Sequence, residues 1–382
     1  MAERLLTLGA EIGAVTKWWA GGIGVRTVDP TVAEFLIQRG AVLTVHAASA
    51  LGLIPELEKL LDSDPSLIQA KGTDACSPLH FARNIPTAKF LVDRGAQLDA
   101  RDEDHDSTPA QWLIGDAPEV SRYLVERGAM ADIYMAAAWG DRILAEKLIS
   151  ADRSCLSQWI GRGPDFPSLG YKQSGGTIYQ WTLGFNSFPH QIALKKGHTE
   201  LFNFLFVESD AKTQFLVCCV LARRNEAQSI LAQNPGLVGS LDKIDLELLA
   251  RYCWETNLHI EAVRLMLDLG FPISSPESAH GYTPLHNAAW AGDADLVELL
   301  LQRGHPTNII DPRYKATPLN YALHDCLVEK RHPEGDFVRV VKLLLDAGSP
   351  LQGIDFPTGN DAIDELLRPG LSAKTSPANR QN

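Results

Sequence analysis

The chain has 382 residues, of which 45% are hydrophobic and 21% are charged, and its mean hydropathy is -0.08. This composition excludes a largely disordered chain and predicts a protein that folds in water. The formal net charge of -12 disfavours nucleic-acid binding, because an acidic surface repels phosphate groups. Neither an apolar run of about 18 residues nor a signal-peptide pattern is found, so we expect no membrane span and no secretion. The six cysteines show no metal-site spacing, so we expect a cytoplasmic protein with no metal and no cofactor.

A short motif recurs along the chain. Its fullest copy, at residues 283–288, is Thr-Pro-Leu-His-Asn-Ala, and weaker copies lie at 77–82, 108–111, 188–193 and 317–322. Most copies are followed by an apolar helical stripe that ends near a glycine. Counted at the histidine position, successive copies from His46 to Asn320 lie 34, 31, 23, 57, 28, 32, 35 and 34 residues apart.

This pattern resembles the ankyrin repeat, whose signature is Thr-Pro-Leu-His-x-Ala and whose period is about 33 residues. The resemblance implies an all-α solenoid with short hairpin tips, here with one long inserted loop. Thr-Pro suits the start of the first helix, because the hydroxyl caps free N–H groups and proline has no N–H to leave unpaired. No repeat can bury its own faces, so the core forms by stacking, with the first helices on the concave side.

In chain order, the sequence predicts about ten helix pairs. The predicted segments are a degenerate N-terminal unit at 1–43, ankyrin repeats at 44–154, an inserted loop at 155–187, ankyrin repeats at 188–358, a capping helix at 359–370 and a disordered tail at 371–382. Within the N-terminal unit we expect a first helix around Trp18 and a second at 32–38.

The signature histidines at 46, 80 and 286 have a structural interpretation. In the resembled family this side chain hydrogen-bonds neighbouring backbone and holds adjacent tips in register. Gln111, Gln191 and Asn320 could do the same with an amide. We therefore do not count these positions as catalytic.

Residues 102–106 form an acidic tip in which the usual glycine is missing. Aspartate is common in tips because it makes local turns and caps the following helix. However, His105 lies between Asp104 and Asp106, and a carboxylate beside an imidazole also suits a general base or part of a cation site. The sequence leaves both interpretations open.

The inserted loop accounts for the step of 57 residues, which is 57 - 33 = 24 residues longer than the period of about 33. Its glycines, prolines and aromatic residues predict an ordered loop with aromatic anchors. The loop either covers a neighbouring repeat or meets the acidic tip and closes a pocket. His190 follows the loop at a position where the signature has leucine, so its ring needs a polar partner or a cavity.

A second, shorter excursion of ten extra residues lies around 326–335, and we expect it to lengthen the turn between two helices. Tryptophans at 112, 139, 181, 254 and 290 fall on predicted first helices or near them. Rings at helical spacing belong to a core or line a groove that binds a ligand.

Two functions remain. The first is a monomeric recognition scaffold that binds a partner protein or peptide through its concave face and hairpin tips. Its candidate contact residues are Asp102, Trp112, Trp139, Tyr179, Trp181 and Trp290. The sequence has no complete catalytic motif such as Gly-x-Ser-x-Gly or a phosphate loop, which favours this function over catalysis.

The alternative is a pocket protein or enzyme that acts on a small polar molecule, such as a sugar or an acyl compound, between the acidic tip and the insertion. Asp104, His105 and Asp106 would act as acid or base, with Asp165 as a second carboxylate and His190 as a further proton carrier. Under this alternative Trp112, Tyr179 and Trp181 would form a stacking wall.

Overall fold

The computed structural model describes residues 7, 12, 16–18, 21–23, 30–162, 178–254, 259–277 and 280–375. The chain divides into two compact units, residues 1–208 and residues 209–382. The regular secondary structure of the described residues is helical apart from two three-residue strands. The first helix of one pair packs against the first helix of the next, as α18 (Pro284–Trp290) does against α20 (Pro318–His324). The expected all-α solenoid is confirmed.

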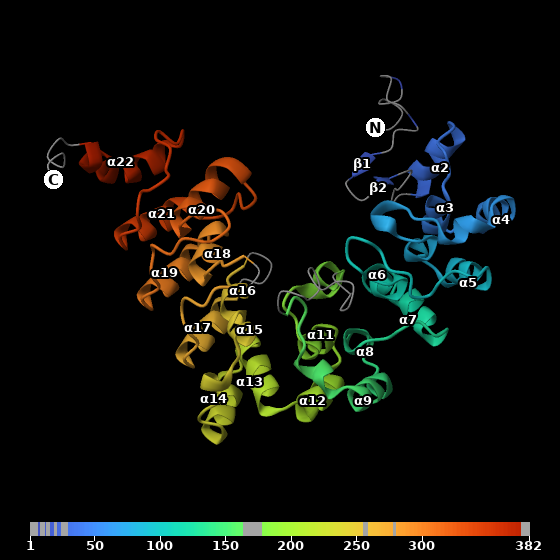
Figure 1. Ribbon diagram of the computed structural model, residues 1–382, viewed down its shortest axis with the longest axis horizontal. Coiled ribbons are helices and arrows are strands. Elements are labelled where there is room, and N and C mark those ends of the chain that lie inside the picture. The colour runs from blue at the N-terminus through green and yellow to red at the C-terminus, as the bar shows by residue number, and fades with distance from the viewer. Residues whose placement is uncertain are drawn as a thin grey trace. The chain divides into compact units, whose positions relative to one another are not determined.

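Unit 1 contains two strands and the helices up to residue 208 (Figure 1). They are β1 (Thr16–Trp18), β2 (Gly21–Ile23), α2 (Pro30–Gln38), α3 (Val45–Leu51), α4 (Ile54–Ser63), η1 (Pro65–Gln69), η2 (Thr73–Ala75), η3 (Pro78–Phe81), α5 (Ile85–Asp93), α6 (Pro109–Asp116), α7 (Pro118–Glu126), α8 (Ile133–Trp139), α9 (Arg142–Ala151), η4 (Arg153–Ser157), η5 (Gln180–Gly184), α11 (Pro189–Lys195) and α12 (Thr199–Glu208). Each motif copy in this unit starts a helix at its proline, because the preceding residue adopts an extended conformation and ends the tip.

The start of the chain differs from the sequence prediction. The first helix expected around Trp18 is replaced by the antiparallel pair β1 and β2, in which Thr16 lies opposite Ile23 and Trp18 lies opposite Gly21. Two adjacent glycines disfavour a helix at this point, whereas threonine, tryptophan and isoleucine suit strands. The second helix is present as α2, close to the expected range of 32–38.

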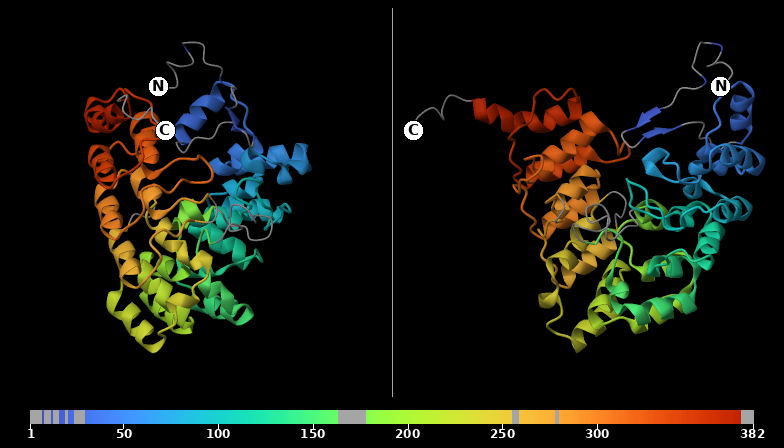
Figure 2. Two further views of the ribbon diagram at one scale, coloured as in Figure 1. Left: turned by 60° about the vertical axis from the view of Figure 1, so that its left-hand side comes forward. Right: turned by 45° about the vertical axis from the view of Figure 1, so that its right-hand side comes forward.

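Unit 2 contains the remaining helices. They are α13 (Ala211–Val220), α14 (Arg224–Gln233), η6 (Val238–Ser240), α15 (Lys243–Leu246), α16 (Leu248–Arg251), α17 (Ile260–Asp268), α18, α19 (Ala294–Gln302), α20, η7 (Asp325–Glu329), α21 (Phe337–Asp346) and α22 (Asp361–Thr375). Both views in Figure 2 show these helices in successive layers, from yellow α13 to red α22. The expected capping helix is α22, and it continues past residue 370 to Thr375.

The core of each unit lies between the helix layers. Small alanines on the first helices are completely buried, which lets neighbouring first helices approach closely. These alanines are Ala48, Ala82, Ala110, Ala136, Ala193, Ala288 and Ala322. Leucines and valines of the second helices fill the space behind them, as Leu296, Val297 and Leu300 of α19 do. Larger side chains lie at the ends of these first helices, such as Trp290 at the end of α18 and His324 at the end of α20, where they line a surface.

Candidate functional site

The first helices of unit 2 are fixed at their N-termini by capping side chains. In α18, the Thr283 backbone N–H donates to Nδ1 of His286 over 3.3 Å, and Nε2 of that ring lies 3.2 Å from the Ala316 carbonyl oxygen in the next tip. In α20, Asn320 makes the equivalent two contacts. Its side chain accepts from the Thr317 N–H at 2.9 Å and donates to the Gln352 carbonyl at 3.2 Å. These links hold consecutive tips in register and so fix the positions of side chains further along each helix.

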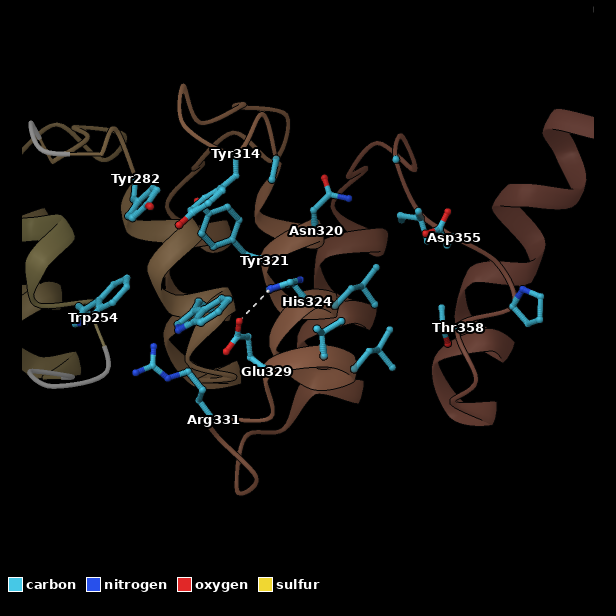
Figure 3. Close-up of a pocket in the computed structure, with 18 residues that line it drawn as sticks. Trp254, Tyr282, Tyr314, Asn320, Tyr321, His324, Glu329, Arg331, Asp355 and Thr358 are labelled. Carbon is cyan, nitrogen blue, oxygen red and sulfur yellow. Dashed lines mark ion pairs between the residues drawn. The ribbon is translucent and has the colours of Figure 1, made fainter. Parts of the chain in front are cut away.

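A groove of about 780 Å³ lies over these helices. Its volume is within the usual range for ligand sites, about 300–1,000 Å³. It is lined by residues of the α16 end, α18, α20, η7 and the segment before α22 (Figure 3). Its aromatic, polar, charged and aliphatic lining residues include Trp254, Tyr282, Trp290, Tyr314, Asn320, Tyr321, His324, Leu327, Val328, Glu329, Arg331, Ile354, Asp355 and Thr358.

One part of the groove is a continuous cluster of aromatic rings. The ring of Tyr282 is nearly parallel to those of Trp254 and Tyr314, and its centroid lies 6.3 Å from each of theirs. Tyr321 meets Tyr282 edge-on at 5.5 Å and Trp290 edge-on at 6.0 Å. Rings in such arrangements gain about 0.5–1.5 kcal/mol per pair beyond their area burial, which favours a preformed wall.

This wall carries polar atoms as well as rings. The indole N–H of Trp290 is buried and donates to no atom in the part of the chain that the structure describes. A buried donor without an acceptor costs about 1–3 kcal/mol, so it favours a ligand that brings a carbonyl oxygen. Burial raises the pKa of the Tyr282 phenol to about 12. At physiological pH the Tyr282 phenol is neutral and keeps its O–H proton.

The rest of the groove is aliphatic in the middle and charged at its edges. Leu327 and Val328 belong to η7, and the Val328 side chain is 65% exposed. Glu329 Oε1 lies 3.7 Å from Nε2 of His324, whose ring stacks on Trp290 at 5.9 Å. Figure 3 shows Arg331 near the Trp254 side of the groove and Asp355 toward the opposite side, with His324 and Asn320 between them.

The excursion after α20 places Arg331 on that side. The sequence predicts only a longer turn at 326–335; here α20 continues into η7, a single π-helical turn, before the chain reverses. Buried Asp325 holds the reversal, because its carboxylate accepts from the Arg331 and His332 backbone N–H groups, each over 3.2 Å. The chain then returns to α18, where the Asp336 N–H donates to the Gly292 carbonyl at 3.0 Å.

The acidic tip of unit 1 is built around Asp102, which is only 3% exposed. Its carboxylate accepts from the backbone N–H of His105 at 2.5 Å, that of Ser107 at 2.8 Å and the indole N–H of Trp112 at 2.8 Å. Burial by itself raises the pKa of Asp102, but these hydrogen bonds outweigh it and hold the pKa below its usual range. Asp102 and Trp112, two of the predicted contact residues, therefore bind each other.

The three predicted acid or base residues of this tip lie together. His105 Nδ1 is 3.4 Å from Asp104 and 3.5 Å from Asp102, whereas Asp106 faces Arg101 at 3.3 Å. Burial lowers the pKa of His105, but the bond to Asp102 and the surrounding carboxylates outweigh it, so the pKa is raised. This geometry favours a charged His105 that is fixed within the turn.

The end of the insertion packs against the same repeat. The Ile178 N–H lies 3.4 Å from the Ser107 hydroxyl, and the Tyr179 hydroxyl donates to Asp132 at 2.7 Å. Gln111 donates to the same carboxylate oxygen of Asp132 at 3.1 Å. Residues 178–179 thus contact Ser107 and Asp132, and a pocket between the acidic tip and the insertion stays a prediction. Predicted residue Asp165 lies outside the described residues.

The other predicted residues of unit 1 are dispersed. His190 is fully buried between Phe188 and Phe202, and burial lowers its pKa to about 4. Trp139 lies under the Arg122 guanidinium at 5.2 Å, and its carbonyl accepts from the same group. Trp181 is 69% exposed and packs edge-on against Phe185. The acid and base roles of Asp104, His105, Asp106, Asp165 and His190 stay predictions.

Of the predicted contact residues, Trp290 alone lines the groove. The sequence prediction missed Tyr282, Tyr314 and Tyr321 in particular. One signal was available: Tyr282 and Tyr314 both lie on hairpin tips, 32 residues apart, so a stack with a period of about 33 places them side by side.

Among the described helices, none combines the length and the apolar character needed to cross a membrane. Within the described residues, no three His, Cys, Asp or Glu side chains converge in a way that could hold a metal ion. Residues 261–322 match the family model described as ankyrin repeats in many copies. The segment of unit 2 from α17 into α20, which supplies much of the groove, therefore consists of ankyrin-like repeats, a class that mediates protein–protein interaction.

Proposed function

We propose that this protein is a recognition scaffold that binds an extended peptide segment of a partner protein, and that the groove of unit 2 is its binding site. The observation that carries the proposal is the preformed aromatic wall made by Trp254, Tyr282, Tyr314, Tyr321 and Trp290 along an open groove. Aromatic anchors in such grooves supply a large share of binding energy in protein recognition.

The polar pattern of the groove supports a peptide. The indole N–H of Trp290 suits a main-chain carbonyl, and the aliphatic side chains of Leu327 and Ile354 suit an apolar side chain of the peptide.

The six cysteines are free and four of them are buried, which fits a reducing compartment. We therefore place the scaffold in the cytoplasm, where it acts as a monomer.

A random peptide library displayed on phage provides the test. Peptides enriched on the wild-type protein are synthesised with a fluorescent label, and their affinities are measured by fluorescence polarisation. We expect Tyr314→Ala to weaken binding about tenfold or more, because it removes one ring of the wall. Tyr314 is 62% exposed, so its removal leaves the core intact.

The matched control is Met130→Ala, which removes an apolar side chain of the same exposure, 62%, from unit 1. Trp290→Phe is the second groove variant, because it keeps an aromatic ring but removes the N–H donor together with the five-membered part of the indole. Peptides that bind both groove variants as tightly as the wild type would contradict the proposed site. A library that yields no enriched peptide would contradict it as well.

A further inference from the structure

The groove carries two charged side chains at opposite ends that have no partner in the described chain. We infer that the segment bound there presents an acidic side chain to Arg331 and a basic side chain to Asp355, separated by apolar or aromatic residues. This inference rests on the proposed function and specifies the chemistry of the occupant.

Arg331 is the first of these charges. It is exposed at the edge of the groove, and its guanidinium makes no ion pair or hydrogen bond with any residue that the structure describes. Several other arginines of unit 2 form ion pairs: Arg224 and Arg303 both contact Asp268, at 2.6 and 2.7 Å, and Arg339 contacts Asp295 at 2.6 Å. An unpaired guanidinium at the edge of this groove can bind a carboxylate through two N–H groups.

Asp355 is the second charge. It is exposed in the segment between α21 and α22, and within the described ranges no donor contacts its carboxylate. By contrast, Asp364 in α22 accepts from both the N–H and the hydroxyl of Thr358, at 2.8 and 2.7 Å. Asp355 is therefore not used for capping, whereas Asp364 is. A lysine or arginine side chain of a bound segment would complement it.

The two charges also set the direction of a bound chain. Arg331 comes from the excursion that returns to α18, and Asp355 follows Gln352, whose carbonyl binds Asn320 of α20. They therefore belong to successive layers of the stack, and Figure 3 shows the aromatic and aliphatic lining between them. Charges at opposite ends favour one orientation of the ligand and oppose the reverse orientation, which brings like charges together.

Other occupants fit this pattern less well. Nucleic acid would bring phosphates toward Glu329 and Asp355, which repel them. A second copy of this chain carries the same net charge of -12, which opposes association. A neutral small molecule would leave both charged ends unused.

The experiment uses the full chain and the peptides selected on it. We expect the enriched sequences to share an acidic and a basic residue on either side of an apolar or aromatic residue. Arg331→Glu and Asp355→Lys should each weaken the labelled peptide about fivefold at low salt, and the loss should shrink as salt is added. Each variant should recover affinity for a peptide in which the matching residue carries the opposite charge.

Matched controls make the same charge changes on exposed residues of unit 1 that have no ion pair in the described chain: Lys147→Glu for Arg331→Glu, and Glu119→Lys for Asp355→Lys. These controls should leave the affinity unchanged. Recovery by the reversed peptide separates a direct contact from a folding defect, because a misfolded variant binds neither peptide.

The outcomes separate the two proposals. Peptides that depend on Tyr314 but are indifferent to both charge reversals would overturn this inference and leave the proposed function standing. Enriched peptides without charged residues at a fixed spacing would overturn it too, as would saturable binding of a neutral small molecule or a second copy in the groove. Peptides whose affinity is unchanged by both Tyr314→Ala and Trp290→Phe would overturn the proposed function itself.

Discussion

Asp102 and Trp112 are joined by a 2.8 Å hydrogen bond from the indole Nε1 to the buried carboxylate. The sequence predicts both residues as contacts for a partner, but the same carboxylate also accepts two backbone N–H groups of the tip. One aspartate thus shapes this turn, because its oxygens organise the backbone directly. The acidic tip is first of all a folded turn, whatever else it binds.

This arrangement predicts that Asp102→Ala destabilises the protein strongly. Three N–H groups lose a charged acceptor, so we expect a loss of about 3 kcal/mol in the free energy of unfolding. Urea denaturation followed by circular dichroism measures the loss. The control is Asp104→Ala, a partly exposed carboxylate of the same tip, which should cost less than about 1 kcal/mol. Equal losses in the two variants would show that Asp102 does not organise the turn.

His105 provides a prediction about pH. Its pKa is raised because the bond to Asp102 and the charges of Asp104, Asp102 and Asp74 outweigh the effect of burial. A raised histidine pKa adds stability that is complete below the ordinary value, about 6.5, and is lost as pH rises through the folded-state pKa. His105→Gln should therefore cost more stability at about pH 5.5 than at about pH 8.5.

Nuclear magnetic resonance titration of the His105 ring gives a direct check. The expected midpoint lies above about 6.5 in the folded protein. Asp104→Asn should move the midpoint down, because it removes one of the carboxylates that favour the charged ring. A midpoint below the ordinary value would contradict the arrangement of charges described for the tip.

The sequence predicts the helix starts well because their cause is local. Thr283, Thr317 and Thr108 each precede a proline and adopt the extended conformation that ends a tip, and all three lie next to the helices that the motif predicts. In the N-terminal unit the adjacent Gly21 and Gly22 disfavour the expected helix, and the strand β2 is found at this position. Local chemistry thus accounts for most element starts and also for this exception.

The groove was much harder to predict. Its rings come from successive repeats, so no single stretch of sequence contains them, and a ring at helical spacing looks the same in a core and in a wall. Arg331 reaches the groove only because Asp325 reverses the chain after α20. A sequence shows that the excursion is long, but the direction of its return depends on contacts such as the Asp336 to Gly292 hydrogen bond.

His190 offers a prediction that also bears on the enzyme alternative. Burial lowers its pKa to about 4, so the folded state holds the neutral ring. Stability from a neutral buried histidine is complete above the ordinary pKa of about 6.5 and is lost as pH falls from there toward about 4. Leucine is the residue that the ankyrin signature has at this position, and His190→Leu should flatten the acid side of the stability profile by roughly 3 kcal/mol.

The control for this change is Asn203→Leu, which introduces the same leucine at an exposed residue of the neighbouring helix α12 that does not titrate. It should leave the acid side of the profile unaltered. Urea unfolding at a series of pH values from about 4 to 8 measures both variants. An unchanged acid slope in His190→Leu would show that the ring is not held neutral by burial, and would make a proton-carrying role for it worth testing.

The last prediction concerns two glycines that both have positive φ. Gly140 has φ +70, and a Cβ atom there would lie 2.6 Å from Nδ1 of His198, whereas Gly197 has φ +85 and no atom within 4 Å of such a Cβ. Gly197→Ala should cost only the conformational strain, about 1 kcal/mol. Gly140→Ala should cost at least about 2 kcal/mol, because the ring must also leave its position 3.2 Å from the Ala138 carbonyl oxygen. Thermal unfolding of the two variants measures the difference in stability. Equal losses would mean that His198 does not link α8 to the turn between α11 and α12.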